Sequence, residues 1–387
     1  MNDTKTLSLC HICYKHIPAE RITKNNAVYL IKTCPEHGRM EYMVEHDVEF
    51  YNSLEYDREG YSIPQGIMIE VTDRCNLNCP HCYHEPDNKV VDRSIDSILK
   101  QIEENVHPEA GAIILAGAEP TVRKDLPELV EAICKQIKDL DRGHQDVCIL
   151  TNGVKLSDRA WVKRIAKAGA RMVMIGLNHP SYQGKTVHRK QLEGIDNCIA
   201  EGIFVYYTGY TLGSLDQMED VLEEIQSLGY KSWQYRIRAG SDIGRSPDEP
   251  RFFLSDHVKL IKSICDKKGW SWEKKPADDN LYHYMVNING ISHRIIQWSD
   301  PKTIDMEQLM CGPWCNFVPL KPVTNFLHQI MLRDANVNNG KPLFDTVPER
   351  YMFKPETVDY KVAEWTYKSW DDYKIKQSDL VLSLIHI

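Results

Sequence analysis

The chain has 387 residues, of which 42% are hydrophobic, and a formal net charge of −8. The length favours two or three domains with packed cores. The acidic balance argues against non-specific nucleic-acid binding, which needs a basic surface. No apolar run approaches the roughly eighteen residues of a transmembrane helix, and the N-terminus lacks the apolar stretch of a signal peptide. We therefore expect a cytoplasmic protein without a membrane span.

The twelve cysteines indicate metal ligands more than disulfides, because several are closely spaced in a large chain without an export signal. Four others lie alone in helix-like or strand-like patterns, where free cysteine behaves as a small buried hydrophobe: Cys134, Cys148, Cys198 and Cys265.

Residues 1–60 contain the pattern C-x2-C-x20-C-x2-H, formed by Cys10, Cys13, Cys34 and His37. Two such pairs separated by a short hairpin are typical of a zinc ribbon, in which one tetrahedral ion stabilises a domain too small to fold alone. We predict a zinc-ribbon-like domain here. His16 is an alternative ligand, and reduced thiols without a metal are the alternative interpretation.

Residues 64–265 alternate apolar strand-like runs with amphipathic helices. The expected strands are 66–72, 112–117, 146–153, 171–178, 203–212 and 232–239. Ser94 is expected to cap the first helix of this region and Ser255 the last. Short apolar strands joined by crossover helices predict an α/β fold, a partial (β/α)6 barrel of parallel strands. Active residues in such folds cluster at the C-terminal strand ends.

Residues 266–381 lose this alternation and predict an α+β region that covers the substrate. Asn-Gly within 284–298 predicts a hairpin. Cys311 and Cys315 lie in CGPWC and could be cluster ligands, redox thiols or packed side chains. Residues 382–387 resemble a translated sequencing adapter, and we exclude them from the fold prediction.

The segment CNLNCPHC directly follows the first strand of the predicted barrel and contains Cys75, Cys79 and Cys82. Three thiolates on one loop can bind three irons of a 4Fe–4S cubane and leave the fourth iron without a protein ligand. A zinc ion with His81 or His84 as a fourth ligand is the alternative.

This spacing and its position resemble the radical S-adenosylmethionine (radical SAM) superfamily. GAEP at 117–120 resembles the GGEP motif of that family, with Ala118 in place of the second glycine, and LTNG at 150–153 is a further family motif. The resemblance implies contacts to S-adenosylmethionine from His81, Gly117, Ala118, Glu119, Asn152, Asn178, Arg236 and Arg238. For Asn178 a turn-forming role is the alternative, and for the two arginines a salt-bridged strand end.

The resemblance also implies the reaction. Reductive cleavage of S-adenosylmethionine at the 4Fe–4S cluster would give a 5′-deoxyadenosyl radical that takes hydrogen from a small-molecule or lipid-like substrate. A low-potential donor such as flavodoxin or ferredoxin would supply the electron. Peptide or protein modification and a non-catalytic metal-binding role are the alternatives. No acid–base pair stands out, so the catalytic residues of the protein remain unknown.

The N-terminal region resembles the extension of pterin methyltransferase-like and tetraether-lipid-synthase-like enzymes. Those relatives carry further cysteine clusters, so the resemblance does not name a substrate for this chain.

Overall fold

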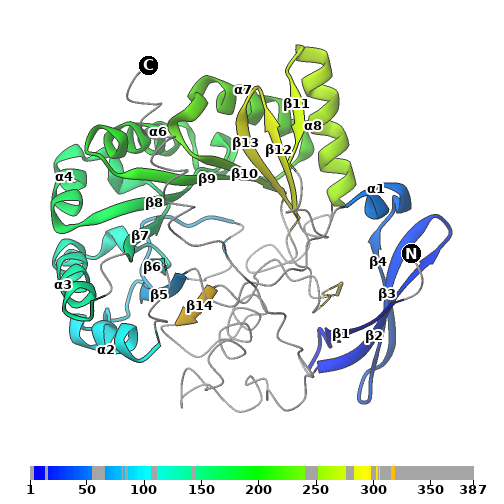
Figure 1. The fold of residues 1–387 in the computed structure, drawn as a ribbon, viewed down its shortest axis with the longest axis horizontal. Coiled ribbons are helices and arrows are strands. Elements are labelled where there is room, and N and C mark those ends of the chain that lie inside the picture. The colour runs from blue at the N-terminus through cyan, green and yellow to red at the C-terminus, as the bar shows by residue number, and fades with distance from the viewer. Residues whose placement is uncertain are drawn as a thin grey trace.

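A computed structural model of the protein describes residues 4–13, 16–54, 66–80, 82, 86–105, 111–141, 145–239, 252–275, 283–297, 302–303, 305 and 315–318. Figure 1 shows a small antiparallel sheet beside a large curved sheet that has its helices on the outer side.

The small sheet has the order β1-β2-β3-β4 and precedes a short helix, α1 (Val48–Ser53). Asn25 and Asn26 join β2 to β3 with φ values of 51° and 57°. Positive φ at both turn residues is the type I′ geometry that suits the twist of a two-residue hairpin. The bounds of the strands are β1 (Thr4–Leu9), β2 (His16–Lys24), β3 (Ala27–Cys34) and β4 (Gly38–Glu45).

Among the described residues, the large sheet has ten strands in the order β11-β12-β13-β10-β9-β8-β7-β6-β5-β14. The run from β13 to β14 is parallel, and β12 and β11 add an antiparallel edge. The six predicted barrel strands are β5 (Gly66–Thr72), β6 (Ala112–Gly117), β7 (Asp146–Thr151), β8 (Ala170–Gly176), β9 (Phe204–Leu212) and β10 (Gln234–Ala239). The α/β partial-barrel prediction is confirmed.

Helices follow the barrel strands and cover the outer side of the sheet (Figure 1). Ser94 caps α2 as predicted, since its hydroxyl accepts from the backbone N–H of Ser97 at 3.2 Å. The bounds are α2 (Ile95–Asn105), α3 (Leu126–Asp139), α4 (Arg159–Ala168), α5 (Pro180–Gln183), α6 (Lys185–Ala200), α7 (Met218–Leu228) and α8 (Leu254–Lys268).

Both faces of the barrel sheet are packed, which explains why its strands read as continuous apolar runs. Side chains such as Ile113 and Leu115 pack against the helices. The alternate residues of these strands face the inner side of the sheet. There they form a second cluster, which consists of Ala112, Ile114, Cys148, Met172 and Met174. Of the four lone cysteines, Cys134 is half-buried and the other three are buried.

The predicted hairpin joins the barrel wall. Asn289 and Gly290 form its turn with φ values of 51° and 78°, between β12 (His283–Ile288) and β13 (Ile291–Ile296). β13 pairs in parallel with β10, and β11 (Trp272–Lys274) lies at the outer edge. The hairpin therefore extends the sheet. At the opposite edge, β14 (Cys315–Val318) pairs with β5. Cys311 and residues 319–387 lie outside the described residues.

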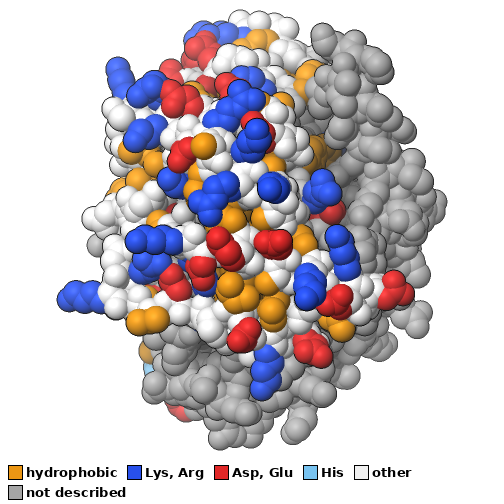
Figure 2. Space-filling view, turned by 90° about the vertical axis from the view of Figure 1, so that its left-hand side faces the viewer, with side chains coloured by type: hydrophobic (Ala, Val, Ile, Leu, Met, Phe, Trp, Pro, Cys, Tyr) orange, Lys and Arg blue, Asp and Glu red, His pale blue; other side chains and the backbone are white. Residues whose placement is uncertain are grey.

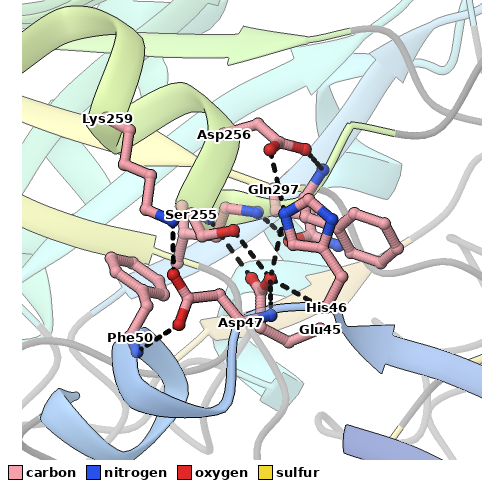
Figure 3. Close-up of polar contacts among 10 residues, drawn as sticks. Glu45, His46, Asp47, Phe50, Ser255, Asp256, Lys259 and Gln297 are labelled. Carbon is pink, nitrogen blue, oxygen red and sulfur yellow. Dashed lines mark hydrogen bonds and ion pairs between the residues drawn. The ribbon is translucent and has the colours of Figure 1, made fainter. Parts of the chain in front are cut away.

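The small sheet contacts the large one through the start of α8 (Figure 3). Ser255 does not cap this helix, which begins at Leu254. Its hydroxyl and N–H donate instead to the Glu45 carboxylate at 2.7 and 3.2 Å. Glu45 is 1% exposed, and burial raises the pKa of its carboxyl group. Lys259 and Asp47 add an ion pair alongside. A buried carboxylate thus connects the end of β4 to the barrel.

The outer face of the helices has a mixed charge. Figure 2 shows lysine and arginine side chains interspersed with aspartate and glutamate on the left-hand side of the Figure 1 view. Arg164 on α4 lies 3.6 Å from Glu128 on α3, an exposed pair of the kind that contributes little to stability. In the described part of the chain, no helix combines the length and apolar character needed to cross a membrane.

Candidate functional site

The four predicted zinc ligands lie together at one end of the small sheet. The ligand atoms of Cys10, Cys13, Cys34 and His37 are all within 4.8 Å of one another. His37 Nδ1 lies 3.5 Å from Cys10 Sγ and 3.4 Å from Cys34 Sγ, and Cys13 Sγ lies 3.8 Å from Cys34 Sγ. Zn–S and Zn–N bonds of about 2.3 and 2.0 Å in a tetrahedron require such spacings. The donor set therefore fits one zinc ion.

The environment of Cys34 favours the thiolate that zinc binds. Burial raises the pKa of this thiol, but hydrogen bonds from the Glu36 backbone and the His37 side chain outweigh burial and lower it to about 6. A thiolate near neutral pH is the form that coordinates metal.

The cysteine loop, residues 73–82, follows β5 directly. The backbone N–H of Leu77 donates to Cys75 Sγ at 3.3 Å, and the N–H of Cys82 donates to the carbonyl of Cys79 at 3.3 Å. Arg74 at the start of the loop is held by Asp92, with Nε 3.1 Å from Oδ1. The loop thus has internal hydrogen bonds and an ion pair at its base.

Cys75, Cys79 and Cys82 are half-buried. Among the described residues, they do not gather within 4.8 Å of one another as the zinc ligands do. Three ligands of a single ion must be that close, whereas a cubane places each thiolate on a different iron. His81 and His84 lie outside the described residues.

Gly117 and Ala118 attach the end of β6 to this loop. The N–H of Ala118 donates to the carbonyl of Thr72 at 3.0 Å, and the N–H of Glu119 donates to that of Arg74 at 3.0 Å. Gly117 has a φ of 118°, and a Cβ there would lie 2.2 Å from the Thr72 oxygen. Only glycine fits this position. Ala118 is not among the residues with positive φ, so alanine is unstrained at the second position of the motif.

The Glu119 carboxylate is fully buried and accepts hydrogen bonds from neighbouring residues of the protein. It accepts from the N–H and hydroxyl of Thr121 at 3.0 and 2.5 Å, from the hydroxyl of Thr151 at 2.7 Å and from the N–H of Asn152 at 2.6 Å. Burial raises its pKa, and these hydrogen bonds oppose the rise. Glu119 therefore connects the ends of β6 and β7.

Asn152 lies against the cysteine loop. Its Nδ2 donates to Asn76 Oδ1 at 2.8 Å and lies 3.9 Å from Cys75 Sγ. Its Oδ1 accepts from the N–H of Val154 at 3.1 Å, which fixes the side chain in the turn after β7. The GAEP and LTNG segments therefore both contact the cysteine loop. This is expected, because the C-terminal ends of parallel strands lie at the same edge of the sheet.

Asn178, Arg236 and Arg238 contact other parts of the barrel. The buried Asn178 carbonyl accepts from His188 Nδ1 at 3.1 Å. Arg236 and Arg238 lie on the inner face of the barrel, because the alternate residues of β10 pack in the helix-side core. The Arg236 guanidinium lies 3.7 Å above the ring of Tyr207, and Arg238 Nε donates to the Thr211 hydroxyl at 2.6 Å.

Several neighbours of the cysteine loop were not predicted from the sequence. Asn88 Oδ1 accepts from the N–H of Cys75 at 3.0 Å. Gln183 Nε2, at the end of α5, lies 2.8 Å from Cys79 Sγ. No local motif marks this residue, which lies 104 positions from its partner. The Asn-His-Pro turn that follows β8 and begins α5 is the nearest signal in the sequence.

Two family profiles match the chain: the radical SAM superfamily over residues 69–228, and the HMPTM N-terminal zinc ribbon domain over residues 3–46. The 7,8-dihydro-6-hydroxymethylpterin dimethyltransferase of Methanocaldococcus jannaschii is 32% identical over 313 residues, which are 68% of this chain and 59% of that protein. The chain thus spans less than two thirds of that relative.

The GTP 3′,8-cyclase of Clostridium perfringens strain 13 is 30% identical over 327 residues, which are 80% of this chain and 95% of that protein. Among solved structures, Streptococcus suis SuiB bound to S-adenosylmethionine has a TM-score of 0.41 and 14% identity, covering 65% of this chain and 69% of that chain.

Proposed function

Because this chain belongs to the radical SAM superfamily, we propose that Cys75, Cys79 and Cys82 hold its 4Fe–4S cluster and that the enzyme methylates a pterin-type heterocycle. The support for the substrate class is that this chain contains two matched regions, one after the other. A zinc ribbon of the HMPTM type precedes the radical SAM region, and the pterin dimethyltransferase is similar along most of this chain.

The proposed roles of the protein groups follow from their positions. When bound, the cluster and S-adenosylmethionine supply a one-electron reductive cleavage that starts radical chemistry on the substrate. The backbone at Gly117 and Ala118 forms the cofactor edge beside the cysteine loop. Glu119 holds the turn containing Asn152 against that loop. His81 was predicted to pack near the adenine and stays a proposal.

Asn178, Arg236 and Arg238 would bind the ribose and carboxylate of S-adenosylmethionine from the opposite wall. Their support is the inner-face position of the two arginines and the buried location of Asn178. Arg236 contacts the uncharged Tyr207 ring and Gln234 side chain, so these described contacts leave its positive charge to an anionic ligand.

We propose that the chain divides into a zinc-ribbon domain (1–60), a radical SAM core (64–265) and a substrate-covering region (266–381). Residues 382–387, which resemble a translated sequencing adapter, are not assigned to a domain.

Radical SAM enzymes need an electron donor, and we propose flavodoxin or ferredoxin. Ten cysteines of the described residues are free thiols, and we propose a reducing compartment such as the cytoplasm.

The test is an anaerobic assay of the reconstituted full chain with dithionite, S-adenosylmethionine and 7,8-dihydro-6-hydroxymethylpterin. We expect 5′-deoxyadenosine and methionine from one molecule of S-adenosylmethionine. With a further molecule as the methyl source for each methyl group transferred, we expect S-adenosylhomocysteine and a pterin product heavier by one or two methyl groups in mass spectrometry. Cys79→Ala should lose the iron and these products, whereas Cys134→Ala, a half-buried cysteine outside the loop, should keep them. No 5′-deoxyadenosine from an iron-loaded wild type would contradict the enzyme assignment.

A second candidate substrate is GTP. The observation that favours it is the alignment with GTP 3′,8-cyclase along 95% of that protein. The same assay with GTP in place of the pterin separates the two candidates. Consumption of GTP with the pterin unchanged would replace the pterin proposal, and the radical SAM assignment would stand.

A further inference from the structure

We propose that Gln183 is a positioning residue that raises the reduction potential of the cluster by donating a hydrogen bond to the Cys79 thiolate. The inference rests on the proposed cluster ligands and not on the identity of the substrate. Gln183 Nε2 lies 2.8 Å from Cys79 Sγ, whereas the Leu77 N–H and Asn152 Nδ2 lie 3.3 and 3.9 Å from Cys75 Sγ.

A second amide fixes the orientation of Gln183. Its Oε1 lies 3.4 Å from Gln191 Nε2, whose two hydrogens already face backbone carbonyls at shorter distances. The contact is therefore a weak, shared one, in which the partly positive NH2 group of Gln191 favours an oxygen over a nitrogen. Because the oxygen of Gln183 faces this donor, its nitrogen is the atom that faces Cys79. The assignment of the two ends of the amide therefore follows from the hydrogen-bond network.

Gln191 is itself fixed by the ends of two barrel strands. It lies on α6 with 0% exposure, and its Nε2 is 2.7 Å from the carbonyl of Asn152 and 3.0 Å from that of Gly176. These carbonyls follow β7 and end β8. The position of the Gln183 donor is therefore set by the barrel and not by the cysteine loop alone.

The backbone around Gln183 supports the same position. His179 caps α5, its ring accepting from the N–H of Ser181 at 3.3 Å, and Pro180 begins the helix. Gly184 ends it with a φ of 82°. The single turn of α5 thus ends at Gln183, whose side chain contacts Cys79 of the cysteine loop.

The effect on the cluster follows from charge. One-electron reduction adds a negative charge that is shared with the thiolate ligands, and a donor on a thiolate stabilises the reduced form more than the oxidised form. The donor at Cys79 should therefore raise the reduction potential and ease reduction by the electron donor. The Leu77 N–H makes a similar contact to Cys75, but that contact lies within the loop.

The test is an EPR-monitored redox titration of the reconstituted full chain, without S-adenosylmethionine or substrate. Gln183→Leu removes the donor. In this variant, we expect the ratio of reduced to oxidised cluster at a fixed solution potential to fall about tenfold. For a one-electron couple, this corresponds to a reduction potential lower by about 59 mV. Gln183→Glu adds a negative charge instead of a donor and should lower the ratio further.

Gln217→Leu is the matched control. Gln217 lies near the same turn, but its Nε2 donates to the Ser181 hydroxyl at 2.9 Å and not to a cluster thiolate. The cluster of this variant should therefore have the wild-type reduction potential. Unchanged potentials in both Gln183 variants would overturn the proposal. Loss of iron in both, with iron retained in the control, would assign Gln183 to cluster assembly and also overturn it. An iron-free wild type would instead contradict the cluster assignment.

Discussion

Replacing Gly117 by alanine should separate β6 from the cysteine loop. A Cβ at this position would lie 2.2 Å from the Thr72 carbonyl oxygen, whereas ordinary contact begins at 3.4 Å, so the backbones must part by about 1.2 Å. That movement breaks the 3.0 Å hydrogen bond from the Ala118 N–H to the same oxygen. The φ of 118° adds strain for a side chain. Strain of about 2 kcal/mol and a lost hydrogen bond of about 1 kcal/mol give a destabilisation of about 3 kcal/mol.

The assay is thermal unfolding by circular dichroism together with the iron content of the reconstituted protein. At about 2 °C per kcal/mol, Gly117→Ala should unfold about 6 °C below the wild type and hold less iron. Ala118→Gly is the matched control, because Ala118 makes the neighbouring contact without positive φ, and it should cost no more than about 1 kcal/mol. A Gly117→Ala protein with wild-type unfolding temperature and iron content would refute the steric argument.

Three further changes test other parts of the structure. Cys13→Ser should reduce the zinc content from about one ion per chain to nearly none in elemental analysis, whereas Cys134→Ser should not, because only Cys13 lies in the ligand group. Burial raises the pKa of Glu45 above its ordinary 4.5, so the folded protein binds that proton more tightly than the unfolded chain. Relative to Glu45→Gln, the wild type should therefore lose stability as pH rises through the raised pKa, and equal pH dependence in urea unfolding would contradict this. Burial lowers the pKa of His293 from 6.5 to about 4. The neutral ring therefore stabilises the folded protein above pH 6.5, and about 3 kcal/mol of the free energy of unfolding is lost as the pH falls toward 4. In His293→Phe, the free energy of unfolding in urea should depend less on pH over this range.

The position of Glu119 changes the interpretation of the GAEP segment. The sequence resemblance implied a carboxylate that faces S-adenosylmethionine. In the structure the carboxylate accepts four hydrogen bonds from Thr121, Thr151 and Asn152. A fully buried carboxylate needs such donors to offset its desolvation. Its hydrogen bonds therefore assemble the edge of the site from two strands.

Local patterns in the sequence predicted much of the fold. The strands from β5 to β10 lie within two residues of their predicted starts, because a strand buried on both faces requires a continuous apolar run. Asn289 and Gly290 predicted their hairpin, because positive φ at both positions selects for such residues. The four zinc ligands were readable because their spacing matches two turns of a small sheet.

Contacts between distant residues could not be predicted in this way. Gln183 and Cys79 are 104 positions apart, and Glu45 and Ser255 are 210 apart. No periodicity relates such pairs, because each depends on how whole strands and helices are placed. Tertiary placement also put β13 beside β10, a pairing that no local pattern predicted.

The cysteine loop shows the same division. The sequence by itself determined which three thiols share a loop and that the loop follows a strand, since both are matters of spacing. Only the tertiary structure decided which groups surround those thiols, since Asn152 and Gln183 come from other strand ends. The physical reason is that the parallel sheet gathers the C-terminal ends of its strands at one edge, and packing then selects the side chains that reach the sulfur atoms.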